Sequence, residues 1–145
     1  INDNVDIAVK TGADGVHVGQ EDLAAGRARE LLGPDKIIGV SAHNAEEARA
    51  AQAAGADYLG VGAAFVTGTK TDAKPISRDT IRAVTAAVDI PVVAIGGISH
   101  DNILELAGCG LDGVAVVSAI FAQPDPGAAT RHLLELARTM VASHG

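Results

Sequence analysis

Tryptophan is absent from this chain, and aromatic residues make up only 2% of its 145 residues, although 48% are hydrophobic. The core must therefore be built from valine, isoleucine, leucine and alanine. Layers of such side chains suit parallel strands packed against helices better than an aromatic-rich sandwich. Proline is also scarce, with five residues beside 17 glycines. This balance indicates many tight strand–helix junctions, and the apolar content excludes a disordered chain.

Positive charge is in short supply, because the formal net charge is −7. We therefore expect no nucleic-acid partner and no anionic membrane surface. A phosphorylated small molecule is compatible with this charge if a metal ion or backbone N–H groups hold it locally. Cys109 is the single cysteine, so no disulfide forms within the chain, and we expect a cytoplasmic protein. No run is long and apolar enough to span a bilayer, and no signal-peptide pattern occurs.

Short apolar runs alternate with helical patterns along the chain. The predicted strands are 15–19, 36–42, 58–63, 91–97 and 113–120, and the predicted helices include 22–32, 44–54, 78–88, 101–107 and 126–141. Such alternation predicts βαβ units with a parallel sheet. A junction of the form Gly-x-Asp before a strand recurs in the runs TGAD, AGAD and CGLD. This repeat favours a barrel of equivalent units, although a doubly wound sheet would use similar junctions.

The strand count predicts an incomplete (β/α)8 TIM barrel. Five whole strands follow a strand end at Ile1–Asp3, whereas a closed barrel needs eight. We therefore expect residues 1–145 to form a partial TIM-barrel domain, with about five whole βα units plus the end of a sixth strand. Two strands and most of a third would precede Ile1. A chain limited to these residues would be inactive and would self-associate through its open sheet edges.

Polar or small residues stand at the end of each predicted strand. In parallel α/β folds, ligands bind at these carboxyl ends because the following loops and helix N-termini converge there. The residues concerned are Asn2, Asp3, Gln20, Glu21, Asp22, Ser41, His43, Thr67, Thr69, Lys70, Gly96, Gly97 and Ser118. Asp3 and Asp22 follow neighbouring strands, so their carboxylates could share a Mg²⁺ ion that carries substrate phosphate oxygens. Simple helix capping is the alternative for Asp22.

Two further features suit phosphate. The connection at 65–77 is long for a βα loop and offers donor groups from Thr67, Thr69 and Lys70, with a solvated turn as the alternative. Gly97 and Ser118 stand at consecutive predicted strand ends, where many barrels hold a phosphate. The histidines carry less weight, because no two have a metal-ligand spacing. Of these, His17 lies in mid-strand and could point into the barrel.

At these residues the chain resembles the thiamine-phosphate synthase family. The matching runs are IND at 1–3, GVHVGQED at 15–22, GVSAH at 39–43, TGTK at 67–70, VVAIGGI at 92–98 and GVAVVSAI at 113–120. They span almost the whole chain in the family's order. The GVHVGQED and GVSAH runs are the specific ones, since double-glycine and SAI elements occur in many phosphate-binding barrels.

The resemblance implies an activity and a role for each site residue. The family joins hydroxymethylpyrimidine diphosphate to a thiazole phosphate, giving thiamine phosphate and pyrophosphate. By similarity, Asp3 and Asp22 would hold Mg²⁺, while Asn2 and Lys70 would contact the diphosphate. Ser41 would lie near the reacting pyrimidine and, with Lys70, is the implied catalytic residue. The thiazole phosphate would be received by Thr67, Thr69, Gly97 and Ser118.

The chain differs from the family pattern at some positions, and three alternative functions are compatible with parts of the pattern. The family has prolines in the loop where this chain has Ala63 and Val66, and the family's other pyrimidine-pocket residues lie on earlier strands. One rival is a thiazole tautomerase of the same superfamily, against which Asp3, Asp22 and Lys70 argue. A different phosphate-binding barrel would need acid–base residues that the strand ends lack. A non-catalytic ligand-binding relative is the third alternative.

Overall fold

Five parallel strands form one sheet, as the alternating pattern predicts. The computed structural model describes residues 1–20, 24–68 and 74–143. The strands pair in sequence order and are β1 Gly15–Val18, β2 Ile37–Ala42, β3 Tyr58–Val61, β4 Val92–Ile95 and β5 Gly113–Ala115. The helices are α1 Val5–Thr11, α2 Ala24–Leu32, α3 Ala45–Ala53, α4 Arg78–Ala87, the 3₁₀ helix η1 Ile103–Leu106, α5 Ser118–Phe121 and α6 Pro126–Ala142.

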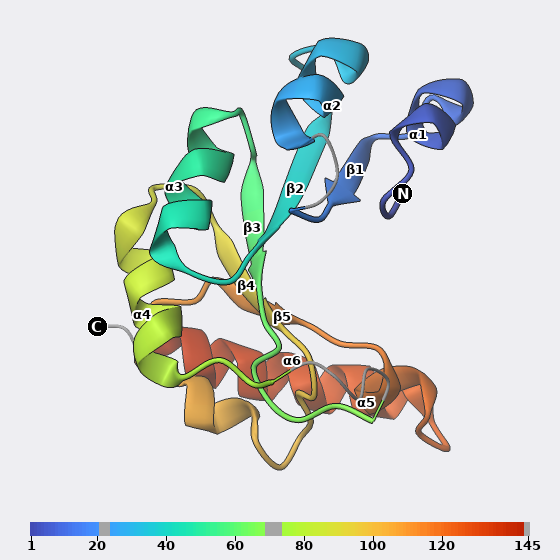
Figure 1. Ribbon diagram of the computed structural model, residues 1–145. Coiled ribbons are helices and arrows are strands. Elements are labelled where there is room, and N and C mark those ends of the chain that lie inside the picture. Colours follow the sequence, from blue (N-terminus) through green and yellow to red (C-terminus); the bar gives the residue numbers. More distant parts are fainter. Residues whose placement is uncertain (21–23, 69–73, 144–145) are drawn as a thin grey trace.

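The first residues extend this sheet beyond β1. Asn2 forms a parallel bridge with His17, and the His17 N–H donates to the Ile1 carbonyl at 2.9 Å. The Asp3 N–H in turn donates to the His17 carbonyl at 2.7 Å. The prediction of a strand end at Ile1–Asp3 is therefore confirmed. Among the described residues β1 and β5 do not pair, so the sheet is an open arc (Figure 1).

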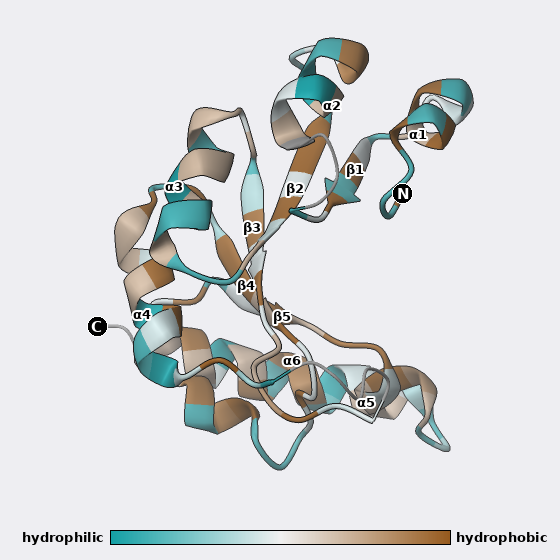
Figure 2. Ribbon diagram, in the orientation of Figure 1, coloured by the Kyte–Doolittle hydropathy of each residue, from teal (hydrophilic) through white to brown (hydrophobic). Residues whose placement is uncertain are grey.

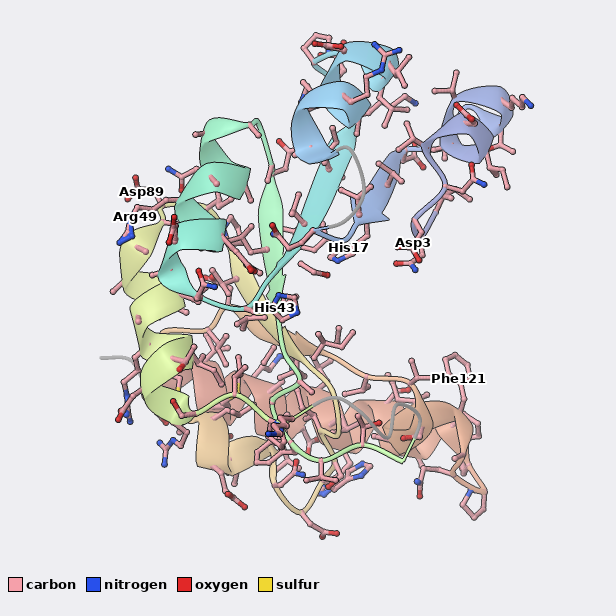
Figure 3. All side chains as sticks on the ribbon, in the orientation of Figure 1. Asp3, His17, His43, Arg49, Asp89 and Phe121 are labelled. Atoms are coloured by element: carbon pink, nitrogen blue, oxygen red, sulfur yellow. The ribbon has the colours of Figure 1, made fainter. Side chains whose placement is uncertain are left out.

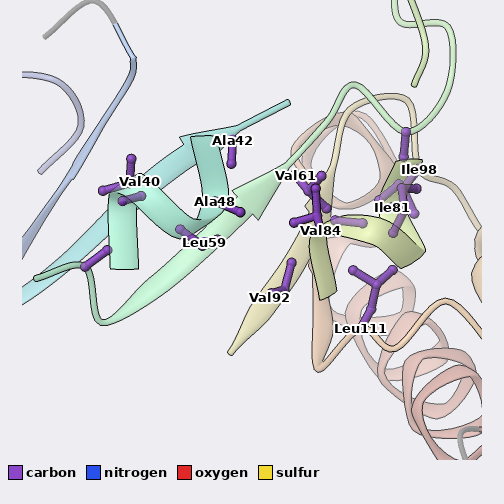
Figure 4. Packing of buried hydrophobic residues seen from close by; sticks show 14 of the residues in the cluster. Val40, Ala42, Ala48, Leu59, Val61, Ile81, Val84, Val92, Ile98 and Leu111 are labelled. Atoms are coloured by element: carbon purple, nitrogen blue, oxygen red, sulfur yellow. The ribbon is translucent and has the colours of Figure 1, made fainter. Parts of the chain in front are cut away.

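The core lies between the sheet and the helices. Alternate strand residues, such as Val40, Leu59 and Val61, are buried against helical residues that include Ile81 and Val84 of α4 (Figure 4). Alanines at buried positions of α2 and α3 allow the helices to approach the strands closely. Hydrophobic residues dominate β2 and β4, whereas α3 shows hydrophilic residues (Figure 2). The opposite strand face carries His17, Ser41 and Tyr58 together with glycines of β2 and β3, and also the exposed Ile37 and Ile95.

Two predicted elements have different bounds or type. The predicted strand 113–120 ends at Ala115, and Ser118 begins the short helix α5. The Phe121 N–H donates to the Val117 carbonyl at 2.9 Å, which closes a helical turn. An apolar run such as GVAVVSAI does not distinguish a buried strand from a buried helix. The predicted helix 101–107 is reduced to the single 3₁₀ turn η1.

The repeated Gly-x-Asp junctions join neighbouring strands at the edge where the strands begin. Gly55 and Gly110 both have positive φ, which glycine adopts without a Cβ penalty. The aspartate that follows accepts a hydrogen bond from the start of the preceding strand. Asp57 Oδ2 accepts from the Ile38 N–H at 2.7 Å, and Asp112 Oδ2 accepts from the Val92 N–H at 2.8 Å. The repeat therefore marks a structural contact between adjacent units.

Arg29 of α2 strengthens one of these junctions. Its guanidinium donates to Asp57 Oδ2 at 2.6 Å and to the carbonyls of Lys36 at 2.6 Å and Gly55 at 2.8 Å. Its side chain is only 22% exposed. One side chain thus connects α2 with the segments that enter β2 and β3.

Replacement of Arg29 by alanine is expected to lower the free energy of unfolding by about 1–3 kcal/mol, because the partly buried carbonyls of Lys36 and Gly55 lose a charged donor. Urea denaturation measures this loss. The matched control is Arg27→Ala, whose side chain is 59% exposed and forms a surface ion pair with Glu30, so its expected cost is below about 1 kcal/mol. Equal losses in both variants would contradict the assigned role of Arg29.

Candidate functional site

The described site residues lie at or beyond the carboxyl ends of the strands, at one edge of the sheet. Because every strand runs in the same direction, the carboxyl ends of all strands meet at the same edge. The predicted residues on this edge are Asn2, Asp3, Ser41, Thr67, Gly97 and Ser118. Asp22, Thr69 and Lys70 lie outside the described residues. The structure therefore collects on one rim the described residues that the sequence pattern singled out.

Asp3 has an unusual backbone at the end of the first strand segment. Its φ is 65°, a left-handed value that no other non-glycine residue in the described part of the chain adopts. The Asn2 Nδ2 group donates to Asp3 Oδ2 at 2.9 Å, so the carboxylate has a fixed neighbour while remaining exposed. A non-glycine residue at positive φ costs about 1 kcal/mol or more. Asp3 thus places an exposed carboxylate, in contact with Asn2, at the rim.

A cluster of three polar side chains lies on the strand face opposite the helices. His17 of β1 places Nδ1 2.9 Å from Tyr58 Oη and Nε2 3.0 Å from Ser41 Oγ. Ser41 belongs to β2 and Tyr58 begins β3. The Gln20 Nε2 group donates to the Ser41 carbonyl at 2.6 Å, so both the side chain and the backbone of Ser41 are held.

The electrostatics of this cluster favour a neutral imidazole. Burial lowers the pKa of His17 below its ordinary value of 6.5, and the nearby charge of Asp3 opposes this shift to a smaller extent. Burial also raises the pKa of the Tyr58 hydroxyl above 10.0. Figure 3 shows Asp3 and His17 facing the same open side of the sheet. At neutral pH the cluster therefore presents hydroxyl groups and one uncharged ring beside a carboxylate.

The double glycine after β4 has a local structural reason. Gly96 and Gly97 both have positive φ, and a Cβ at Gly97 would collide with the carbonyl oxygens of Phe65 and Val66. The loop that carries Thr67 therefore lies directly against Gly97. The Phe65 N–H donates to the Gly96 carbonyl at 3.0 Å. These contacts bring the ends of β3 and β4 together at the rim.

Ser118 opens the four-residue helix α5, which follows β5. It is exposed, and the neighbouring side chains of Val117 and Phe121 are exposed as well. The position is one turn beyond the end of the strand, not on the strand itself. The exposed His43 contacts Glu47, whose carboxylate lies 2.9 Å from His43 Nδ1 and also accepts from the His43 N–H.

His17 and Tyr58 are the residues that sequence reasoning undervalued. The sequence pattern placed His17 in mid-strand, where it could point into the barrel, and did not identify Tyr58 as a site residue. A signal for both existed in Gly39 and Gly60, since glycine inside a strand often marks the close approach of another group. A Cβ at Gly39 would overlap the Tyr58 ring, and a Cβ at Gly60 would lie 3.2 Å from His17 Cε1.

The polar groups at the rim include carboxylate oxygen atoms, which are the type of ligand that Mg²⁺ prefers. Magnesium takes oxygen ligands and commonly uses one or two carboxylates together with substrate phosphates. Asp3 supplies an exposed carboxylate. Within the described ranges, no group of three or more His, Cys, Asp or Glu side chains could hold a metal ion. In the same ranges, no helix has the length and hydropathy needed to cross a membrane.

The fold and the polar rim define a protein of the (β/α)8-barrel class. Comparison with known proteins agrees. The structure of thiamine phosphate pyrophosphorylase from Pyrococcus furiosus matches 97% of this chain and 67% of its own, with a TM-score of 0.85 and 42% identity. The BexX/CysO complex of Amycolatopsis orientalis, with a TM-score of 0.75 and 21% identity over 97% of this chain and 61% of that chain, shares the fold. The predicted barrel-type α/β fold is confirmed.

The sequence profile of the thiamine monophosphate synthase family matches residues 1–120. The chain belongs to this family. It is 54% identical over 136 residues to the thiamine-phosphate synthase of Ruminiclostridium cellulolyticum. The matched region covers 94% of this chain and 65% of that protein. The chain thus spans 65% of the length of this relative. The resemblance read from the motifs is therefore confirmed at the level of the family.

Glycine at position 3 is expected to be more stable than alanine by about 1 kcal/mol, because only glycine adopts positive φ without strain. Urea denaturation of Asp3→Gly and Asp3→Ala measures the difference. The control is Asp6 in α1, where the order must reverse, with alanine more stable than glycine by about 0.5–1 kcal/mol. The same order at both positions would rule out the left-handed backbone at Asp3.

The lowered pKa of His17 predicts a pH dependence of stability. The unfolded chain binds the His17 proton more tightly than the native protein, so its contribution to stability is complete above pH ~6.5 and is lost as pH falls below that value. Urea denaturation between pH ~5 and ~7.5 should show wild-type protein losing stability relative to His17→Gln in this window. A difference between the two proteins that stays constant with pH would contradict the shift.

Proposed function

We propose that this protein is a thiamine-phosphate synthase that couples hydroxymethylpyrimidine diphosphate with thiazole phosphate and releases pyrophosphate. The observation that carries the proposal is the joint presence, on one rim, of an oriented carboxylate at Asp3 and the held hydroxyl of Ser41. Family membership supports the choice of this reaction. The names of the relatives describe a transferase of this type.

The chemistry asks for little general base catalysis. Departure of pyrophosphate leaves a pyrimidine methylene cation that the aminopyrimidine ring stabilises by resonance, and the thiazole nitrogen then attacks it. Catalysis consists of neutralising the leaving group and positioning the nucleophile. A rim of carboxylate, hydroxyl and amide groups suits these two tasks.

Each residue has a defined task in this proposal. Asp3 and Asp22 would hold Mg²⁺, which when bound neutralises diphosphate charge. Asn2 and Lys70 would contact the diphosphate, and Ser41 would orient the pyrimidine. The thiazole phosphate would lie between the loop after β3 and the segments after β4 and β5, against Thr67, Thr69, Gly97 and Ser118. The contact between Gly97 and the Phe65–Val66 backbone supports this placement.

Two accompanying expectations form part of the proposal. A cytoplasmic location is supported by the single cysteine, Cys109, which is buried and excludes a disulfide within the chain. Self-association of residues 1–145 through unpaired strand edges is supported by β5, which among the described strands pairs only with β4. Analytical ultracentrifugation of this segment measures the second expectation.

The full-length protein with Mg²⁺ is expected to release pyrophosphate only when both substrates are present. Asp3→Asn, which tolerates the same backbone conformation, should slow this release at least tenfold, on the order of losses seen when metal-site groups are removed. The control Asp6→Asn, on the exposed side of α1, should retain the wild-type rate. Metal-independent rearrangement of thiazole phosphate, without pyrophosphate release, would identify a tautomerase and overturn the proposal.

A further inference from the structure

In the Tyr58–His17–Ser41 cluster, the position of the proton on His17 decides which group donates in each hydrogen bond. His17, Gly39 and Tyr58 occupy adjacent strands at the same level, since His17 pairs with Gly39 and Gly39 pairs with Tyr58. Residues at paired positions of a sheet share a face. Tyr58 and His17 are thus separated by one strand whose intervening residue has no side chain.

The missing side chain at Gly39 permits the contact. A Cβ there would overlap Cζ, Cε1 and the hydroxyl of Tyr58, so the phenol ring passes over β2 in the space that glycine leaves. The ring centroids of Tyr58 and His17 lie 5.5 Å apart. Gly60, which pairs with Ser41, leaves equivalent room for the far side of the imidazole.

The two ring nitrogens of His17 impose opposite roles on their partners. A neutral imidazole has one N–H donor and one acceptor nitrogen. Both partners are hydroxyls, at 2.9 Å from Nδ1 and 3.0 Å from Nε2. A phenol is far more acidic than an aliphatic alcohol, so it is the better donor of the two. The favoured arrangement has Tyr58 donating to Nδ1 and the Nε2–H donating to Ser41 Oγ.

We infer that Tyr58 is a positioning residue that, through His17, makes the Ser41 hydroxyl a hydrogen-bond donor toward the ligand. Once Ser41 Oγ accepts from His17 Nε2–H, its own proton points to another acceptor. Gln20 donates to the Ser41 carbonyl, which holds the backbone that carries this hydroxyl. The ligand group that such a donor suits is an uncharged acceptor nitrogen or oxygen on a heteroaromatic ring.

This inference rests on the proposed function for the identity of that ring, which is the pyrimidine of the diphosphate substrate. The geometry supports it, because each ring nitrogen of His17 lies at hydrogen-bond distance from one hydroxyl group. In the opposite arrangement, with the proton on Nδ1, Ser41 would donate its hydroxyl proton to His17. The Ser41 hydroxyl could then only accept a hydrogen bond from the ligand.

Nitrogen NMR of histidine-labelled protein reads the proton position directly. His17 is assigned by the signals lost in His17→Gln. In wild-type protein at pH ~7.5, well above the ordinary histidine pKa, His17 should carry its proton on Nε2, with Nδ1 showing the shift of a hydrogen-bonded acceptor. In Tyr58→Phe the Nδ1 signal should move toward that of a free acceptor nitrogen. A wild-type proton on Nδ1 would overturn the inference.

Steady-state kinetics of the full-length protein supply the second readout. Tyr58→Phe should raise the KM for the pyrimidine diphosphate about three- to tenfold, as expected for one weakened neutral hydrogen bond, and leave the KM for the thiazole phosphate unchanged. Gly39→Ala should act in the same way, because it displaces the Tyr58 ring. Unchanged or equally raised KM values for both substrates would overturn the role assigned to Tyr58.

The matched control removes a hydroxyl elsewhere in the sheet–helix packing. Thr85 Oγ1 donates to the Cys109 carbonyl at 2.7 Å, so Thr85→Val loses one partly buried hydrogen bond outside the rim. It should leave the His17 signals and both KM values at their wild-type values. If wild-type protein releases no pyrophosphate, the proposed function fails, and the position of the His17 proton alone decides whether the relay exists.

Discussion

Parallel pairing of the five strands is the constraint on which the rest of this structure depends. Parallel strands need a crossover between each pair, and the helices that supply it cover one side of the sheet. The strand ends are then left at one edge, where Asp3, Ser41, Gly97 and the loop of Thr67 gather. The starting edge is closed by a different device, in which Asp57 and Asp112 accept hydrogen bonds from the preceding strand. One edge is thus structural, and the other is free for chemistry.

Glycine residues determine which groups can contact one another on the inner face of the sheet and at its rim. Gly39 admits the Tyr58 ring, and Gly97 admits the Phe65–Val66 backbone. In each case the absence of a side chain allows a group from a neighbouring strand or loop to come into contact with the glycine. The chain has a single tyrosine, and its ring occupies the space that Gly39 leaves.

Much of the fold could be predicted from the sequence because its signals are local. Apolar runs between turn residues predicted the first four strands to within a few residues, and Asn44, Ser77 and Asp125 cap their helices as such side chains do at helix starts. The strand end at Ile1–Asp3 was recognisable from its motif. The region 113–120 was misassigned, since a continuous apolar run lacks the periodicity that separates a strand from a short helix.

The amino-acid sequence by itself determined the family, the alternation of strands and helices, and the chemical type of the residue after each strand. These depend on spacing along the chain. Only the tertiary structure decided that His17 lies between Tyr58 and Ser41, residues 41 and 24 positions away. That contact arises from strand register, because moving β2 by one residue would turn Gly39 and Ser41 to the other face. The left-handed backbone of Asp3, next to the bridge between Asn2 and His17, was likewise visible only in the tertiary structure.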